Sequence, residues 1–327
     1  MKSASIVSLI VAVVIIAAGI ITCTVANNKA EANGNPLFAQ ARGDDFVRTV
    51  DLSENNVSRI SLDFADADVN IYGSSSASYI EFVNFSETLY SLNITNTSLS
   101  FSEIPDISSM LRFWESGFTF KGMRFILNPR TYDNSRMKSI NIYLTQDYNV
   151  KQIEIDADKA TVSIENLSCS ADYVITAEEL TLYSSSVRTD SMLKINSGKD
   201  ITPAKKAKLD FSASRFGSVS ISADELELSG ETYGLSSGTV VCKTGSIDWN
   251  TSIPEISAPI PEKIQITTGG MLSVNGKVKE SPFTFDSTTE EEPAKFSLDI
   301  SASDASVAVT VPYLSEKSTK SSDADES

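Results

Sequence analysis

The sequence predicts an all-β protein: an irregular β-solenoid or β-helix-like repeat domain behind one N-terminal transmembrane helix. Three observations predict this class: an apolar run near the N-terminus, alternation of apolar and polar residues from Phe46 to about Leu314, and a short motif that recurs within that region. Alternation with a period of two is typical of strands, and no stretch of the region keeps a 3.6-residue period over helical length. A β-sandwich is the alternative, because the spacing of the motif is uneven.

The apolar run covers residues 6–26. As a helix it would be long enough to cross a hydrocarbon core of about 30 Å. Lys2 precedes the run, so residues 1–5 are expected to be a short cytoplasmic end. Two alternatives remain open, namely cleavage after the small residues 24–26 and lipid attachment at Cys23. All three interpretations place the rest of the chain outside the cytoplasm.

Behind this signal-anchor, three segments follow. Residues 27–45 are polar and contain an Asn-Gly-Asn-Pro sequence, which predicts a linker. Residues 46–314 form the extracellular β-repeat domain, and the charged, Ser-rich residues 315–327 are expected to be a disordered tail. The domain contains two cysteines, Cys169 and Cys242, which are either one disulfide or two small buried thiols.

The recurring motif joins two short runs of alternating apolar residues through a centre of small and acidic residues. In the copies that begin at Ile60, Ile153 and Leu298, the apolar positions change from even to odd numbers, or the reverse, across the centre. A straight strand would then turn its apolar face to solvent, so the motif predicts a corner or bulge at each centre. A looser copy begins at Leu209 and has residues 212–214 as its centre.

Residues 57–72 carry a family likeness. They resemble the opening repeat of the bacterial "putative adhesin" β-repeat proteins, a family catalogued largely as a domain of unknown function. Its pattern continues with a Ser/Asp-rich turn and another strand, here residues 73–76 and 79–82. The likeness extends over about residues 46–311 and is broken by the bulky residues 113–127. It implies an envelope-associated β-repeat domain and no catalytic residues.

Composition restricts the function further. The formal net charge of −16 would repel nucleic acid. The chain has no histidine, and therefore lacks the commonest general base and metal ligand. Matches to the Ser-x-x-Lys motif of penicillin-recognising enzymes occur at Ser135 and Ser191, with a Lys-Thr-Gly match at residues 243–245. None lies in a helical pattern, so we interpret them as chance matches and predict no enzyme and no cofactor.

Two pairs of carboxylates flank motif centres: Asp66 with Asp68, and Asp156 with Asp158. Residues two apart on a strand point the same way, so each pair could contribute to a calcium site. The Gly-rich nonapeptide of calcium-binding β-rolls is missing, which favours solvated corner residues and no metal site.

A run of bulky aromatic residues is the candidate partner-binding site. Such a run could pack as a cap or core of the first subregion, or it could be exposed as an interface. The candidate residues are Phe113, Trp114, Phe118, Phe120 and Phe125.

These observations favour a membrane-anchored, non-enzymatic cell-envelope protein with an adhesin-like binding or scaffolding role. Its expected partners are the membrane, through the N-terminal helix, and an unidentified envelope or surface molecule. The alternative is an exterior sensor or regulatory subunit of an envelope-stress system that works through a partner membrane protein. An enzyme acting on envelope polymers is the least favoured hypothesis, because no motif supports it.

Overall fold

The computed structural model describes residues 47–85, 90–103, 118–120, 123–125, 137–188, 190–196, 201–251 and 261–311. These residues form strands and turns without any helix, so the all-β class is confirmed for them. The predicted transmembrane segment 6–26 lies outside the described residues. Within the described ranges, no helix is long and apolar enough to cross a membrane.

The chain divides into two compact units. Within the smaller unit, the described strands are β6 (Phe118–Phe120) and β7 (Met123–Phe125), which form an antiparallel hairpin. The larger unit holds the other strands: β1 (Val47–Asp51), β2 (Arg59–Ser74), β3 (Tyr79–Val83), most of β4 (Tyr90–Ile94), β5 (Ser98–Glu103), β8 (Ser139–Thr145), β9 (Gln152–Glu165), β10 (Asp172–Ser185), β11 (Met192–Ile195), β12 (Ala204–Arg215), β13 (Ser218–Tyr233), β14 (Ser237–Asn250), β15 (Glu262–Thr267), β16 (Leu272–Val274), β17 (Lys277–Lys279), β18 (Phe283–Asp286) and β19 (Phe296–Thr310).

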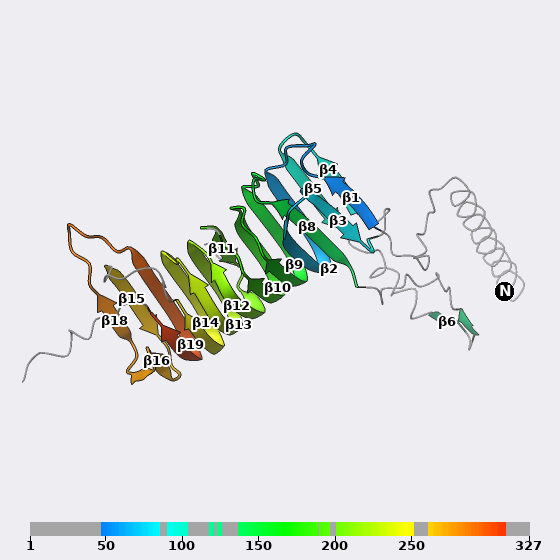
Figure 1. Cartoon of the computed structure of the whole chain (residues 1–327). Helices are drawn as coiled ribbons and strands as arrows, with labels where there is room; N and C mark the ends of the chain where they lie inside the picture. Colours follow the sequence, from blue (N-terminus) through cyan, green and yellow to red (C-terminus); the bar gives the residue numbers. More distant parts are fainter. Residues whose placement is uncertain are drawn as a thin grey trace, which may run out of the picture. The chain divides into compact units, whose positions relative to one another are not determined.

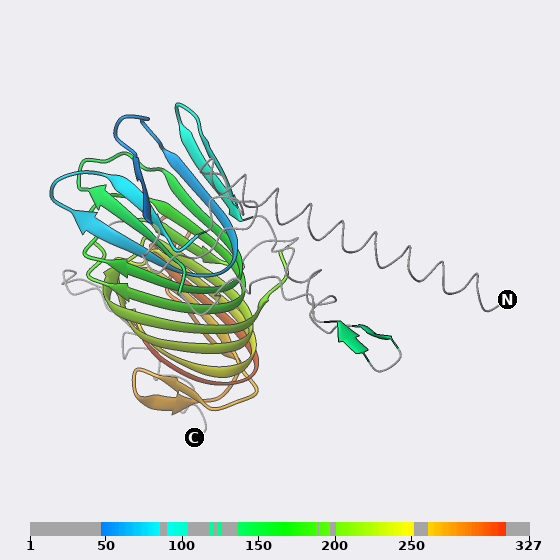
Figure 2. The ribbon, with the colours of Figure 1, turned by 90° about the vertical axis from the view of Figure 1, so that its right-hand side faces the viewer.

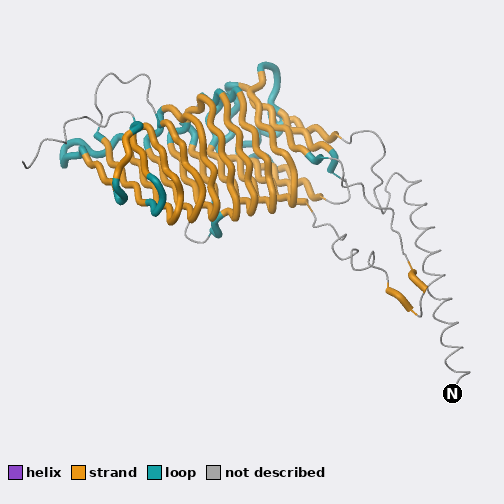
Figure 3. The backbone as a smooth tube through the Cα atoms, turned by 90° about the horizontal axis from the view of Figure 1, so that it is seen from below, coloured by secondary structure: helices purple, strands orange, loops and turns teal. Residues whose placement is uncertain are grey.

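Parallel pairing stacks the long strands of the larger unit in one row (Figures 1 and 3). We call each level of the row a rung. β9 pairs in register with β2 on one side and with β10 on the other. Further along, β13 pairs with β14, and β14 pairs with β19. Three other levels consist of two strands each, namely β5 with β8, β11 with β12, and β15 with β16.

The order of the rungs differs from the order of the chain at both ends of the row. β2 is the first long strand in the sequence, yet it lies between β9 and the later pair β5 and β8. β19 is the last strand, yet it lies between β14 and the earlier pair β15 and β16. Antiparallel strands then extend the two ends: β3 and β1 beside β8, and β18 and β17 beside β15 and β16.

Each long rung bends in the middle (Figure 2). In β9, buried and exposed residues alternate over residues 152–157, which we call the first arm, and over residues 160–165, the second arm. Between the arms, Asp158 and Lys159 are both exposed. β2 and β19 show the same two consecutive exposed residues. The corner predicted from the change of parity is therefore confirmed in the three clear copies of the motif.

The looser fourth copy is a different feature. Residues 212–214 are not a mid-rung corner; they form a bulge near the end of β12, where the register with β13 shifts. Ala213 has a positive φ of 49° there. The corner of that rung is instead at Lys205 and Lys206, which are consecutive exposed residues. Further corners occur in β10, β13 and β14. Their central residues include charged ones, so a motif defined by small residues does not find them.

Inward side chains of successive rungs fill the space between the two arms and the return segments. Trp249 of β14 is fully buried, and its indole Nε1 donates a hydrogen bond to Thr232 Oγ1 at 3.0 Å. Gly238, on the same strand, makes room for it. A Cβ at Gly238 would lie 3.0 Å from Trp249 Cη2 and 2.9 Å from Leu298 Cδ1. Large and small residues thus complement each other in the core, as close packing requires.

Candidate functional site

The predicted aromatic site lies largely beyond what the structure describes. Phe113 and Trp114 are outside the described residues. In the hairpin of β6 and β7, the Cα of Phe118 is opposite that of Phe125, and Phe120 is opposite Met123. This register brings three of the candidate residues onto one small hairpin. Their role in partner binding stays a prediction.

The two predicted carboxylate pairs lie on the outer surface of the rungs. Asp66, Asp156 and Asp158 are exposed, and Asp68 is partly exposed. The pKa of Asp156 is raised, first by partial burial and then by the negative charges of Asp63, Glu154 and Asp158. Among the described residues, no three His, Cys, Asp or Glu side chains are grouped so that they could hold a metal ion. This exposure agrees with the solvated-corner interpretation.

Ser191 and the two cysteines, which the sequence analysis singled out, are all buried in the larger unit. Ser191 is buried, and its Oγ accepts a hydrogen bond from the backbone N–H of Ala171 at 3.1 Å. Cys169 and Cys242 are free and buried, so the interpretation as two thiols is confirmed. Burial raises the pKa of Cys169 to about 11 and also raises that of Cys242. Neither thiol is then a nucleophile near neutral pH, because the thiolate is the reactive form.

The corners of successive rungs line up in a charged ridge. The second exposed residue of each corner faces its equivalent one rung away, and we call this row the corner ridge. Its charges alternate in sign from β2 to β13, and the row ends with a neutral and an acidic residue. The row consists of Asp66, Lys159, Glu179, Lys206, Glu225, Thr244 and Asp304.

Ion pairs join neighbouring rungs along the ridge. Lys206 Nζ lies 3.1 Å from Glu225 Oε1, and this hydrogen bond raises the pKa of Lys206. In the adjacent row, Lys205 pairs with Glu178 at 2.5 Å and Lys243 pairs with Asp224 at 2.8 Å. These side chains are about half exposed or more, so each pair adds little to stability. Within the corner ridge itself, Lys206 and Glu225 form an ion pair, and the two further pairs belong to the adjacent row.

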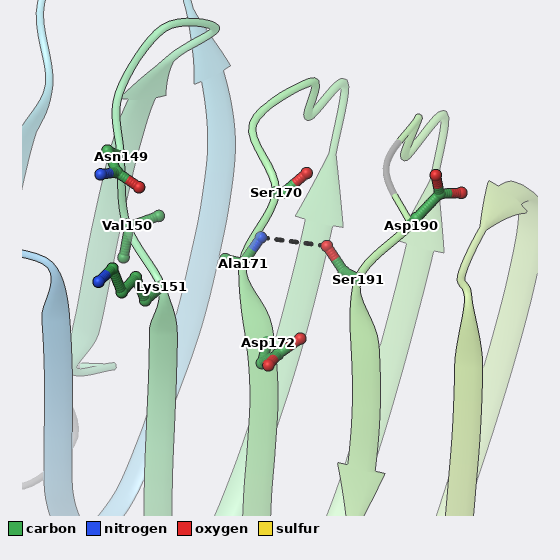
Figure 4. A pocket seen from close by; sticks show the side chains of 8 residues that line it. All are labelled: Asn149, Val150, Lys151, Ser170, Ala171, Asp172, Asp190 and Ser191. Carbon is green, nitrogen blue, oxygen red and sulfur yellow. Dashed lines mark hydrogen bonds between the residues drawn. The ribbon is translucent and has the colours of Figure 1, made fainter.

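A shallow, open polar notch of about 410 Å³ lies in the described part of the chain (Figure 4). The segments that lead into the first arms of β9, β10 and β11 line it. It spans three neighbouring levels of the stack, and its size is within the range of small-molecule sites. The lining residues are Asn149, Val150, Lys151, Ser170, Ala171, Asp172, Asp190 and Ser191.

Hydrogen bonds hold the acidic side of the notch in place. Asp172 Oδ1 accepts a hydrogen bond from the backbone N–H of Met192 at 3.0 Å. Asp190 Oδ1 accepts one from Arg215 Nε at 2.8 Å. The backbone N–H of Asp172 also bonds to the carbonyl of Lys151 at 2.9 Å, which ties two of the three levels together. Each of the two carboxylates therefore has a hydrogen-bond partner outside the notch.

The basic side of the notch is arranged differently. Lys151 and Asn149 are exposed on the side toward β9, while Asp190 lies at the opposite side (Figure 4). Lys151 makes no ion pair with any described residue. In Figure 4 the Lys151 ammonium and the Asp190 carboxylate both point away from the middle of the notch, so these two charged groups do not converge on it. Apart from Ser191, sequence reasoning missed this set of lining residues, because they come from three separate return segments. The signal in the sequence is a 20-residue interval, seen in the ladder partners Ile153, Tyr173 and Leu193.

No family model and no curated protein matches the chain. Solved structures with a similar arrangement include a putative cell adhesion protein from Clostridium sporogenes, with 13% identity over 82% of this chain and 98% of that chain and a TM-score of 0.29. A putative adhesin from Bacteroides fragilis has 9% identity over 84% and 99%, with a TM-score of 0.33. A putative lipid binding protein from Parabacteroides distasonis has 10% identity over 83% and 98%, with a TM-score of 0.29.

These structures carry descriptions of the same kind as the family that the sequence resembles. At such identities and TM-scores, the likeness says nothing about what this chain binds or where it acts. The class defined by the geometry itself is an all-β stack of bent, parallel rungs.

Proposed function

We propose that this chain is a non-enzymatic cell-envelope protein, anchored by residues 6–26, whose β-repeat domain binds or scaffolds an envelope or surface molecule outside the cell. We also class the larger unit as an irregular β-solenoid. Its rungs are joined by short return segments, and backbone hydrogen bonds link those segments too, for example from Arg188 N to Leu167 O at 2.9 Å.

The observation that carries this proposal is the register of the rungs. Parallel pairing places outward side chains of successive rungs in rows, such as Asp68, Thr161 and Thr181 on the second arm. Stacked repeats of this kind offer extended surfaces rather than deep clefts. The exterior location rests on the apolar run 6–26, which is long enough for a membrane helix.

A topology experiment tests the proposal. Intact cells that express the full chain with a C-terminal tag are treated with protease, and the mature N-terminus is read by mass spectrometry. We expect the tag to be digested from outside while the chain retains residues 6–26. A tag that stays protected on intact cells but is digested after lysis would contradict the exterior domain.

A matched pair of variants tests the anchor. Replacing Val13 and Val14 by Lys puts two charges into the centre of the run, where each costs about 2.5–3.5 kcal/mol for insertion. We expect this variant to leave the membrane fraction, while replacement of both residues by Leu leaves membrane association unchanged. Equal membrane association of the two variants would argue against residues 6–26 as the anchor.

A further inference from the structure

A row of stacked tyrosines lies on the outer face of the second arms, at the end of the stack where β3, β8 and β2 are neighbours (Figure 1). Tyr143 of β8 is opposite Tyr79 of β3 on one side and Tyr72 of β2 on the other. The Tyr79 and Tyr143 rings are stacked with their centroids 4.4 Å apart, and the Tyr143 and Tyr72 centroids are 5.5 Å apart. All three residues are partly exposed. Because each ring packs on its neighbour, this tyrosine row is ordered before any partner arrives.

The ladder beside the tyrosine row is polar. It runs from Glu81 of β3 through Asn141, Asn70 and Ser163 to Tyr183 of β10. Asn70 Nδ2 donates a hydrogen bond to Asn141 Oδ1 at 2.9 Å, and Tyr183 is 43% exposed. Tyrosine offers a large contact area at a low cost in conformational entropy, and Ser and Asn adapt their hydrogen bonds to a partner. We call the tyrosine row and this polar ladder together the tyrosine face, and its composition favours a recognition surface.

The tyrosine face bears carboxylates that have no basic partner. Glu81 begins the polar ladder, and Glu165 is opposite Tyr72 in the tyrosine row. Burial raises the pKa of Tyr143, and the negative charge of Glu81 raises it further; burial and then Glu165 do the same to the pKa of Tyr72. Neither carboxylate forms an ion pair with a described residue, and no Lys or Arg belongs to the two rows from β3 to β10. The face is therefore acidic and has no counter-ion of its own.

Glu81 and Glu165 are too far apart for one small cation to contact both. They belong to β3 and β9, and β8 and β2 lie between these strands. Three strand spacings of about 4.8 Å place their backbones at least about 14 Å apart, a distance that an extended peptide covers with about four residues. A segment with basic side chains about four residues apart would meet both carboxylates. A guanidinium suits this surface well, because its planar donor fork matches a carboxylate and its face stacks on aromatic rings.

We propose that the tyrosine face binds an extended, basic segment of a partner protein. Lysine or arginine side chains of the segment meet Glu81 and Glu165, and its polar groups bond to the hydroxyls of the tyrosine row. No hydrogen bond joins the hydroxyl of Tyr72 or Tyr143 to another described residue, so both are available to a partner. This inference rests on the binding role proposed above, and it names the surface and the class of partner. Since the stacked rings are already ordered, little side-chain entropy is lost on binding.

Titration calorimetry of the purified full chain tests the proposal. The protein is kept in a nonionic detergent without a sugar headgroup and in about 0.15 M NaCl, which screens attraction between distant charges. The first probe is a blocked peptide of three Arg-Thr-Ser-Thr repeats followed by arginine, which spaces its basic side chains four residues apart. The second peptide has the same composition with all its arginines adjacent, and the third has glutamate in place of each arginine. Maltotetraose is the neutral probe.

The spacing of the arginines should decide the affinity. We expect the spaced peptide to bind about tenfold tighter than the clustered peptide, because only the spaced arginines reach both carboxylates while the chain stays extended. The glutamate peptide and maltotetraose should not bind.

A double variant and a matched control locate the site. Glu81→Gln combined with Glu165→Gln removes both charges at almost constant side-chain size, and should weaken binding of the spaced peptide about tenfold or more. Glu290→Gln combined with Glu291→Gln removes two charges from exposed residues between β18 and β19, and should leave binding unchanged. Tyr143→Phe keeps the stacked ring but removes its hydroxyl, and should weaken binding about threefold.

Four results would overturn the proposal: no binding of the spaced peptide, equal affinity for the spaced and clustered peptides, binding that Glu81→Gln with Glu165→Gln leaves unchanged, or binding of maltotetraose in place of the peptide. The outcome is separable from that of the topology experiment. A chain whose tag is digested from outside but which binds no basic peptide would lose this inference alone. A chain that binds the spaced peptide but keeps its tag protected would lose the exterior location alone.

Discussion

The interior of the larger unit and its corner ridge are built from the same rungs, and each side chain meets its counterparts one level away. Inside, the residues in contact are alike: Ile155, Ile175 and Leu62 are all buried. Along the ridge, from β2 to β13, residues that are ladder neighbours are opposite in charge, as Glu179 is to Lys159 and Lys206.

This difference shows what in-register stacking demands of a repeated sequence. Identical repeats would place each apolar residue on an apolar residue, which is favourable, and each charge on a like charge, which is destabilising. The repeats can therefore keep similar interiors but must differ at their corners. The interior supplies most of the stability, whereas the ridge favours one order of the rungs over others.

The largest effect is expected in the interior at Trp249. Trp249→Ala should lower the free energy of unfolding by about 3–5 kcal/mol, because it removes a fully buried ring and leaves a cavity. Trp249→Phe, the matched control, fills most of the space and should cost less, although it leaves Thr232 Oγ1 without its indole donor. Urea unfolding measures both, and an alanine variant as stable as the phenylalanine variant would argue against tight packing here.

A smaller effect is expected at Gly238, where a substitution adds volume to a closely packed site. Gly238→Ala should destabilise the protein by about 1–3 kcal/mol, because its Cβ would press on Trp249 and Leu298. Combining it with Trp249→Phe should cost less than the sum of the two single changes, since the smaller ring leaves room. Additive costs in this double-mutant cycle would show that the two sites do not compensate each other.

The ridge should respond to charge and salt more than to volume. Lys206→Glu would place a third acidic side chain directly between Glu179 and Glu225, and should lower the urea midpoint at low salt by less than either interior change. The loss should shrink as salt rises, because exposed charges are screened. Lys206→Met is the control for loss of the ion pair alone. An effect of the reversal that is independent of salt would contradict this electrostatic account of the ridge.

The effect that is smallest near neutral pH concerns the buried thiol of Cys169, because it appears only at alkaline pH. Burial raises its pKa to about 11, so the folded state holds the neutral thiol while the unfolded chain ionises first, near the ordinary value of 9.0. Stability from this group is fully present below pH 9 and is lost as the pH rises from about 9 toward 11. The urea midpoint of the natural chain should fall more between pH 8 and 10.5 than that of Cys169→Ala. Parallel pH profiles would count against the raised pKa.

Sequence reasoning found the corners where small residues mark them and missed those where charges do. The change of parity predicted a bend within each of the centres 65–68, 156–160 and 301–305, because the side-chain period of a strand is fixed. The structure has the bends at residues 65–66, 158–159 and 303–304. In β10 the corner residues are Glu178 and Glu179, and in β12 they are Lys205 and Lys206. In the sequence, these charged corner residues look like ordinary solvated residues of a strand. Their pairing with the corners of neighbouring rungs identifies them as corners.

The apparent irregularity of the repeat also has a structural explanation. The rungs of β9, β10 and β11 begin at residues 152, 172 and 192, an even interval of 20. The interval then breaks, because that level is made of two strands: β11 ends at Ile195, and β12, which forms the second arm, begins at Ala204. At that break, the side chain of Asn196 takes the place of a backbone partner. Its Oδ1 accepts a hydrogen bond from the backbone N–H of Ala177 at 3.1 Å.

By itself, the sequence determined the all-β class, the alternation of each arm and the existence of corners, because these follow from contacts between residues close in the chain. Only the tertiary structure decided that β2 and β19 are inserted out of order, that the corner charges form one ridge, and that three return segments make a notch. Such features depend on which rungs become neighbours. That choice is made by packing and register between segments far apart in sequence, and no local pattern records it.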